Sequence, residues 1–265
     1  MALTLYHNDM SVCSIKSRIA LAEKGLEWTS VHLDLRAGDT QKPEYLKLNP
    51  HALVPTLVHD DKVVIESNVI GEYLDDAFPS PSLRPAEPIA RARMRLWSKQ
   101  LDEGIHAATG TVTTCIAFRH QWLARPREDF ERWIANTPQA DRRERSRANV
   151  EQGTDSPFFT PAVLRFIRML DEMEQALAAH AWLAGDSYSL ADAGFTPYIM
   201  RLEVIGFERE IRARPRVLAW RERLRARPSH AGAITKWINP KYLALFAEHR
   251  DAASAKIATI LESKA

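Results

Sequence analysis

Hydrophobic and polar positions follow two different patterns along the chain. Over roughly the first eighty residues, short apolar runs alternate with stretches whose apolar residues recur at helical spacing. The predicted strands are 2–6, 28–33, 55–58 and 62–65, and the predicted helices are 14–24 and 67–77, with a short irregular helix over 39–48. From residue 89 onward the chain is rich in Arg, Glu, Leu and Ala at helical spacing, so this part is predicted to be helical.

The segment 78–85 separates the two patterns. It contains three prolines and two serines, which suit an extended connection between domains. We therefore place a boundary near residue 82, with an α/β domain over 1–82 and an all-helical domain over 83–265. The helical domain includes a long segment at 119–160 and a tail at 230–265.

Composition narrows the classes of partner. The chain has 36 Lys and Arg against 34 Asp and Glu, a net charge of +2, which provides no broad basic surface for nucleic acid or an anionic membrane. No stretch has the length of a transmembrane helix, and the first residues do not resemble a signal peptide. The two cysteines, Cys13 and Cys115, are too few for a disulfide framework or a thiolate metal site. We expect a cytoplasmic protein that binds neither nucleic acid, membrane nor metal.

Two features of the segment 119–160 have structural interpretations. The charged run 141–147 interleaves acidic with basic residues, which favours a solvated helix face over an anion site. Aromatic residues at this spacing more often form a core than a substrate cage. These residues are Trp122, Phe130, Trp133, Phe158 and Phe159.

The sequence Ser11-Val12-Cys13-Ser14 joins the first predicted strand to the first predicted helix. Side chains there lie at a helix N-terminus, where backbone N–H groups and the helix dipole stabilise a negative charge such as a thiolate. A serine in this place is also a common N-cap, and the motif taken alone favours that interpretation.

Three further features have both a binding and a structural interpretation. Pro55 begins a strand, and a cis Val54-Pro55 bond turns the Val54 backbone toward an extended, peptide-like ligand; the alternative is a trans proline at a sheet edge. Glu66 and Ser67 precede a helix and suit a ligand with an ammonium and a carboxylate, or else simply cap the helix. Lys42 is a cation for a second carboxylate, or a surface lysine.

The order and spacing of these motifs resemble the glutathione transferase superfamily. The residues that carry the resemblance in the first domain are Ser11-Val12-Cys13-Ser14, Arg18-Ile19-Ala20-Leu21, Lys24-Gly25, Lys42-Pro43-Glu44, Asn49-Pro50, Val54-Pro55 and Glu66-Ser67. Further along, Ser189-Leu190-Ala191-Asp192 reads as a capping box and looks like the family's folding motif. The resemblance extends to Arg225–Ser229 and implies a thioredoxin-like glutathione-binding domain followed by a helical bundle that forms most of the substrate pocket.

The resemblance implies a role for each motif, with glutathione as co-substrate. Ser11 falls at the activating position of serine-type classes, so its hydroxyl would donate a hydrogen bond to the glutathione sulfur and favour the thiolate. Cys13 and Ser14 match activating positions of related classes and are alternatives to Ser11. In the binding site, Val54 would pair with the cysteinyl backbone beside a cis Pro55. Glu66 and Ser67 would hold the γ-glutamyl end, and Lys42 the glycyl end.

The implied function is glutathione transfer to an electrophilic, aromatic and hydrophobic small molecule, by a homodimer. The segment 119–160 and the tail 230–265 resemble β-etherase-like bacterial members, so β-aryl ether cleavage is an alternative. Isomerisation or oxidoreduction through Cys13, and non-catalytic ligand binding, are further alternatives. The residues predicted to line the substrate pocket are Thr109, Thr113, Ile116 and His120.

Overall fold

The computed structural model describes residues 2–263, which form two compact units that interleave along the chain. The first unit comprises residues up to Ser98, His180–Pro197 and Trp220–Asn239. The second comprises Lys99–Ala179, Tyr198–Ala219 and the residues from Pro240 onward. The boundary near residue 82 divides the chain by sequence pattern and stays a prediction.

A mixed four-stranded sheet lies in the first unit. Its strands are β1 (Leu3–His7), β2 (Thr29–His32), β3 (Thr56–His59) and β4 (Lys62–Ile65), in the order β2-β1-β3-β4. β1 pairs parallel with β2 and antiparallel with β3, which in turn pairs antiparallel with β4. With α1 and α3 this sheet is thioredoxin-like, and the predicted α/β domain followed by a helical one is confirmed.

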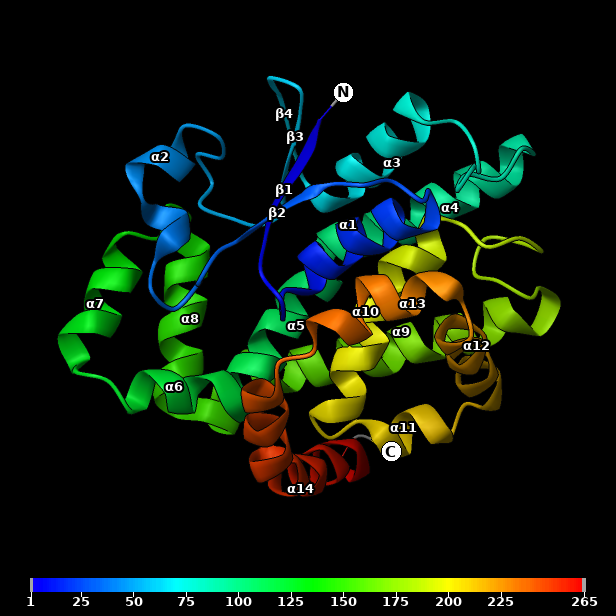
Figure 1. Ribbon diagram of the computed structural model, residues 1–265. Helices are drawn as coiled ribbons and strands as arrows, with labels where there is room; N and C mark the ends of the chain where they lie inside the picture. Colours follow the sequence, from blue (N-terminus) through cyan, green and yellow to red (C-terminus); the bar gives the residue numbers. More distant parts are fainter. Residues whose placement is uncertain (1, 264–265) are drawn as a thin grey trace. The chain divides into compact units, whose positions relative to one another are not determined.

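Three helices flank the sheet: α1 (Val12–Glu23), α2 (Pro43–Leu46) and α3 (Ser67–Ala77). In Figure 1, α1 and α3 lie together on one side of the strands and α2 lies on the other. α3 has the predicted bounds, and α1 begins two residues earlier than predicted. The short irregular helix predicted over 39–48 consists of a 3-10 turn, Asp39–Gln41, and then α2. The reason is Pro43, which keeps Lys42 extended.

The first unit also contains helices that follow the linker 78–85. These are α4 (Pro88–Gln100) up to Ser98, the start of α10 (Leu190–Val204), the end of α12 (Pro215–Arg225) and α13 (Pro228–Ala233). The fully buried Asp192 organises this region, because it accepts hydrogen bonds from the backbone N–H of Leu183 at 3.0 Å and Nε1 of Trp220 at 2.8 Å. It also accepts from the N–H and hydroxyl of Ser189, which confirms the predicted capping box.

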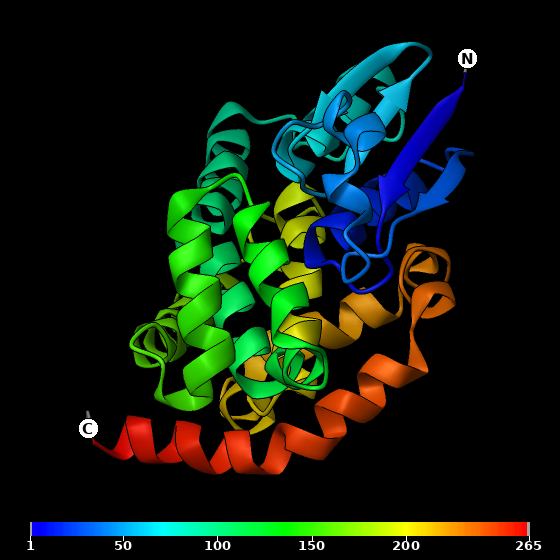
Figure 2. The same cartoon turned by 90° about the vertical axis from the view of Figure 1, so that its left-hand side faces the viewer.

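The second unit is helical throughout. Its helices are the remainder of α10 and α12 together with α5 (His106–Thr113), α6 (Arg119–Leu123), α7 (Arg127–Ala135), α8 (Ala140–Gln152), α9 (Phe159–Ala179), α11 (Glu208–Arg212) and α14 (Pro240–Glu262). A kink at Glu103 and Gly104, whose backbone angles are not helical, precedes α5, and a π-helical turn, Thr114–Phe118, follows it. α14 forms a long terminal helix, red in Figure 2. Over residues 2–263, every helix is too short or too polar to cross a membrane.

The segment 119–160 has its own small core. Trp122, Phe130, Ile134 and Val150 are buried together, and Trp133 packs against them. Trp122, Phe130 and Trp133 therefore serve as core, as predicted; Phe159 is also buried, whereas Phe158 is only half-buried. The charged residues of the same segment form ion pairs. Arg147 contacts Glu131 at 2.6 Å, and Arg145 contacts Asp141 at 3.7 Å. This confirms the prediction of a solvated helix face.

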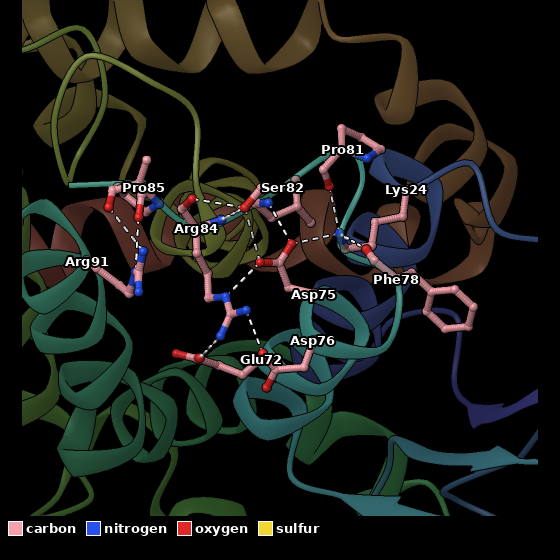
Figure 3. Close-up of polar contacts among 12 residues, drawn as sticks. Lys24, Glu72, Asp75, Asp76, Phe78, Pro81, Ser82, Arg84, Pro85 and Arg91 are labelled. Carbon is pink, nitrogen blue, oxygen red and sulfur yellow. Dashed lines mark hydrogen bonds and ion pairs between the residues drawn. The ribbon is translucent and has the colours of Figure 1, made fainter. Parts of the chain in front are cut away.

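A buried polar network fastens the linker to α1 and α3 (Figure 3). Nζ of Lys24 donates to the carbonyls of Phe78 and Pro81, each at 2.7 Å, and forms an ion pair with Asp75 at 2.7 Å. Asp75 also accepts from the N–H of Leu83 at 2.7 Å. Burial raises the pKa of Asp75, but its hydrogen-bond donors outweigh burial and hold that pKa below its ordinary value.

Replacing Lys24 with methionine is expected to lower the free energy of unfolding by about 3 kcal/mol, because it leaves the Asp75 carboxylate buried without its cation. The matched control is the exposed Lys62, for which Lys62→Met should change this free energy by less than about 0.5 kcal/mol. The Asp75 carboxylate contributes its stability above its unfolded pKa of about 3.9, and loses it as the pH falls through the lower folded pKa. Urea unfolding at neutral pH and at pH about 3 checks both points: the deficit of Lys24→Met should shrink in acid. Equal stability of the two variants at neutral pH contradicts the interpretation.

Candidate active site

Ser11 lies at the N-terminus of α1, at the end of the loop that follows β1. It is the N-cap, with φ −71° and ψ 119°, and its Oγ accepts the N–H of Ser14 at 3.2 Å. Within residues 2–263 the hydroxyl donates no hydrogen bond, so its proton is available to an acceptor. The side chain is half-buried. Ser11 therefore caps the helix and also has a hydroxyl proton that it can donate to a ligand at the positive end of α1.

The structure separates Ser11 from the other two candidates. Ser14 is completely buried, and its Oγ accepts the N–H of Asn8 at 3.2 Å, so it braces the loop before Ser11. Cys13 is half-buried in the first turn of α1 and forms no disulfide with Cys115. Burial raises the pKa of the Cys115 thiol to about 12, so that thiol stays protonated at neutral pH. Ser11 and Cys13 are thus the candidates with access to a ligand.

The backbone around Val54 is held open for pairing. The Val54-Pro55 peptide bond is cis, as predicted. Neither the N–H nor the C=O of Val54 has a hydrogen-bond partner among the residues that the structure describes. The preceding carbonyl, of Leu53, accepts the Tyr45 hydroxyl and Nδ2 of Asn49, which fixes the turn. Burial raises the pKa of Tyr45 to about 12, so it remains a donor. Sequence reasoning assigned Tyr45 no role, because nothing local links it to Leu53.

Glu66 and Ser67 begin α3. Glu66 is exposed and has φ 68° and ψ 114°, a strained conformation of the kind that clusters at ligand sites. Ser67 is buried at the first position of the helix, where the backbone N–H groups lack intrahelical acceptors. Sequence reasoning missed the neighbouring Lys16, which is buried and donates to Oδ1 of Asn68 at 2.9 Å. The helical spacing of α1 did not distinguish Lys16 from a surface lysine.

Lys42 is exposed and pairs with Asp39, three residues earlier, at 2.8 Å. The hydrogen bond from Lys42 lowers the pKa of Asp39, and the same contact raises the pKa of Lys42. Asp39 also accepts the N–H of Asp34 at 2.7 Å, which anchors the carboxylate. A ligand carboxylate must therefore compete with Asp39 for this cation.

The four predicted pocket residues all lie in the second unit. Thr109, Thr113 and Ile116 are buried, and the Thr109 hydroxyl donates to the carbonyl of Ile105 at 2.8 Å. His120 is half-buried and its ring stacks on that of His249 at 3.7 Å. Burial lowers the pKa of His120, and the neighbouring His249 lowers it further. The assignment of these residues to a substrate pocket stays a prediction.

Comparison with known proteins shows the family of the chain. Residues 1–76 match the model of the glutathione S-transferase N-terminal domain, and residues 121–223 match that of its C-terminal domain. The protein LigF of Sphingobium sp. strain SYK-6 is 31% identical over 235 residues, which cover 86% of this chain and 91% of LigF. The crystal structure of LigF, a β-etherase, superposes with a TM-score of 0.80 at 32% identity, covering 89% of this chain and 98% of LigF.

Two other relatives are named for reactions other than ether cleavage. Tetrachloro-p-hydroquinone reductive dehalogenase of Sphingobium chlorophenolicum is 29% identical, covering 86% of this chain and 93% of the relative. Maleylacetoacetate isomerase of Pseudomonas aeruginosa is 30% identical, covering 77% and 83%. The chain belongs to the glutathione S-transferase family. It is a glutathione-dependent enzyme, and glutathione is its co-substrate.

Proposed function

We propose that Ser11 activates glutathione by donating a hydrogen bond to its sulfur. This proposal rests on the Ser11 hydroxyl, which lies at the N-terminus of α1 and donates no hydrogen bond within residues 2–263. A free cysteine thiol has a pKa of about 8.5, and a hydrogen-bond donor together with a helix N-terminus lowers it, so more thiolate is present at neutral pH. Ser14 is completely buried, so its hydroxyl, which accepts the Asn8 N–H, is left to support this loop.

Three groups of the first unit are proposed to hold the rest of glutathione. The unpaired backbone of Val54 adds the cysteinyl unit as an extra strand. Glu66 and Ser67 bind the ammonium and carboxylate of the γ-glutamyl end at the start of α3. Lys42 contacts the glycyl carboxylate.

Substitutions of Lys42 and of its partner Asp39 are expected to change the KM for glutathione in opposite directions. Lys42→Ala should raise the KM for glutathione about 3-fold, since an exposed cation contributes modestly. Asp39→Asn should lower this KM, because it releases Lys42 from its ion pair. The matched control is Lys47→Ala, an exposed lysine five residues away. Steady-state kinetics with varied glutathione measures all three, and an unchanged KM in both Lys42→Ala and Asp39→Asn removes Lys42 from the site.

We infer that the second substrate is a hydrophobic, aromatic electrophile. The thiolate attacks a carbon, the C–S bond forms as the bond to the leaving group breaks, and the leaving group departs with its electron pair. A halide leaves as the anion, and an aryloxide takes a proton from water. Two relatives of this chain support this inference, because one is named a β-etherase and the other a tetrachloro-p-hydroquinone reductive dehalogenase.

Cleavage of β-aryl ethers is the second candidate, favoured by the TM-score of 0.80 with β-etherase LigF. A panel containing an activated aryl halide, a β-aryl ether and a cis-alkene diacid separates the candidates by the product formed. We expect a glutathione thioether from the halide. Release of a phenol from the ether with inactivity on the halide favours the etherase, whereas isomerisation lost in Cys13→Ser favours chemistry through Cys13. Glutathione binding without turnover of any panel member contradicts the proposal.

We propose a homodimer that buries an apolar face of α3 and α4. Val69 and Leu96 are more than half exposed, and the Glu72–Arg95 ion pair at 3.1 Å places these two helices side by side. Sedimentation velocity should give twice the mass of the chain. Leu96→Glu should yield monomers, whereas Leu123→Glu, at a leucine of α6 that is also more than half exposed, should leave the dimer intact. A wild-type monomer at micromolar concentration contradicts the proposal.

A further inference from the structure

The segment 227–239, which we name the clasp, lies along α1 and follows the last residue matched by the C-terminal family model. It begins at Arg227, whose guanidinium binds both carboxylate oxygens of Glu23 at 2.6 Å. The hydroxyl of Ser229 donates to the same carboxylate at 2.5 Å. Glu23 lies in the last turn of α1, so one end of the clasp is fixed there.

Arg18 joins the clasp to the loop 8–10 that leads to Ser11. Its side chain is almost fully buried, and Nε donates to the carbonyl of Ala233 in the clasp at 2.9 Å. The two terminal nitrogens donate to the loop, to the carbonyls of Asn8 at 3.0 Å and Asp9 at 2.9 Å. Burial lowers the pKa of Arg18 to about 10, so the guanidinium stays charged at neutral pH.

An aromatic contact supports Arg18 from the other side. The Arg18 guanidinium carbon lies 5.2 Å from the centroid of the Trp237 ring, within cation–π range. The same ring meets His7 edge-on at 4.7 Å and stacks with Trp28 at 5.8 Å. Burial, with Arg18 adding to it, lowers the pKa of His7 to about 3, so His7 is neutral and its Nδ1 accepts from Arg18 at 3.1 Å.

The end of the clasp holds the loop directly. Nδ2 of Asn239 donates to Oδ2 of Asp9 at 2.8 Å. The other oxygen of Asp9 accepts the N–H of Met10 at 2.8 Å, and Oδ1 of Asn8 accepts the same N–H at 3.1 Å. Met10 immediately precedes Ser11. Arg18 and Asn239 therefore hold Asn8 and Asp9, the residues that lead from β1 toward Met10 and the proposed activating serine.

We propose that the clasp, through Arg18, Trp237 and Asn239, positions Ser11 for its hydrogen bond to glutathione sulfur. This inference rests on the proposed function of Ser11. These are positioning residues, since none of them is placed against substrate. A displacement of about 1 Å at a reacting group can lower a rate about 100-fold. Contacts from a segment 215 residues away along the chain thus control the chemistry at the start of α1.

The test measures the thiol pKa of enzyme-bound glutathione, by thiolate absorbance, together with kcat and the glutathione Kd. Trp237→Ala and Asn239→Ala should each raise the thiol pKa toward that of the free thiol. Trp237→Ala should lower kcat about 10-fold while changing the glutathione Kd less than about 2-fold, because Val54, Glu66 and Ser67 are untouched. Trp237→Phe should restore most of the shift. Ile238→Ser, at an exposed neighbour in the clasp, is the matched control and should behave as wild type.

A double variant separates positioning from general destabilisation. In a Ser11→Ala background, Trp237→Ala should produce no further shift of the thiol pKa, since the group it positions is gone. A further shift of the same size, or no shift in either Trp237→Ala or Asn239→Ala, overturns the inference. If Ser11→Ala shifts the thiol pKa and the clasp variants do not, only the clasp proposal fails. If Ser11→Ala itself has no effect, the assignment of Ser11 fails and the clasp proposal fails with it.

Discussion

Replacing Ser11 with alanine is expected to lower kcat/KM about 100-fold, which is the size of effect seen when one donor to a developing or full negative charge is removed. The loss should fall on kcat, because the proposed contacts to the ends of glutathione remain. It should also be greatest below the thiol pKa of the bound co-substrate and shrink at high pH, where glutathione ionises without assistance. Steady-state kinetics from pH about 6 to 9 measures both effects.

Two matched variants sharpen that experiment. Ser11→Thr keeps a hydroxyl in the N-cap and should retain most of the activity. Cys13→Ser changes the other accessible candidate and should leave kcat/KM within about 3-fold of wild type if Cys13 has no part in the chemistry. Full activity in Ser11→Ala, with the activity lost in Cys13→Ser, transfers the activating role to Cys13.

Replacing Asp192 with alanine is expected to lower the free energy of unfolding by about 5 kcal/mol. The substitution leaves four buried donors without an acceptor, and each unsatisfied donor costs about 1–3 kcal/mol. Those donors are the N–H of Leu183, the N–H and hydroxyl of Ser189, and Nε1 of Trp220. Asp192→Asn should also destabilise the protein, since its amide keeps one acceptor oxygen for the four donors. Urea unfolding followed by tryptophan fluorescence checks both variants.

The control for Asp192 is Asp186, six residues earlier, whose side chain is 82% exposed. Asp186→Ala should change the free energy of unfolding by less than about 0.5 kcal/mol. If Asp192→Ala unfolds at the same urea concentration as Asp186→Ala, the buried carboxylate does not organise the first unit.

Elements with a local signal were predictable from sequence. β4 and α3 have the predicted bounds, because β-branched residues mark the strand and Ser67 marks the first turn of the helix. The predicted helix bounds were wrong where a capping residue or a proline decides where the helix begins. α1 begins at Val12 rather than Ser14 because Ser11 caps it, and the predicted helix 39–48 breaks at Lys42 because Pro43 follows.

Long-range contacts could not be predicted. Nothing near Lys24 indicates that it is buried against Asp75, and nothing near Arg18 indicates Ala233 as its partner. At the site, the resemblance placed Ser11 first, with Cys13 and Ser14 as alternatives, but it could not show which of the three side chains is accessible. Burial separates Ser14 from the other two, and burial depends on the packing of distant segments.

Ser11 is proposed to stabilise the thiolate of bound glutathione. Spectrophotometric titration of the enzyme saturated with glutathione measures this directly, with Ser11→Ala titrated in parallel. We expect the bound thiol of the wild type to ionise below the free-thiol pKa of about 8.5, and that of Ser11→Ala to ionise close to it. The same thiol pKa in both proteins would contradict the account.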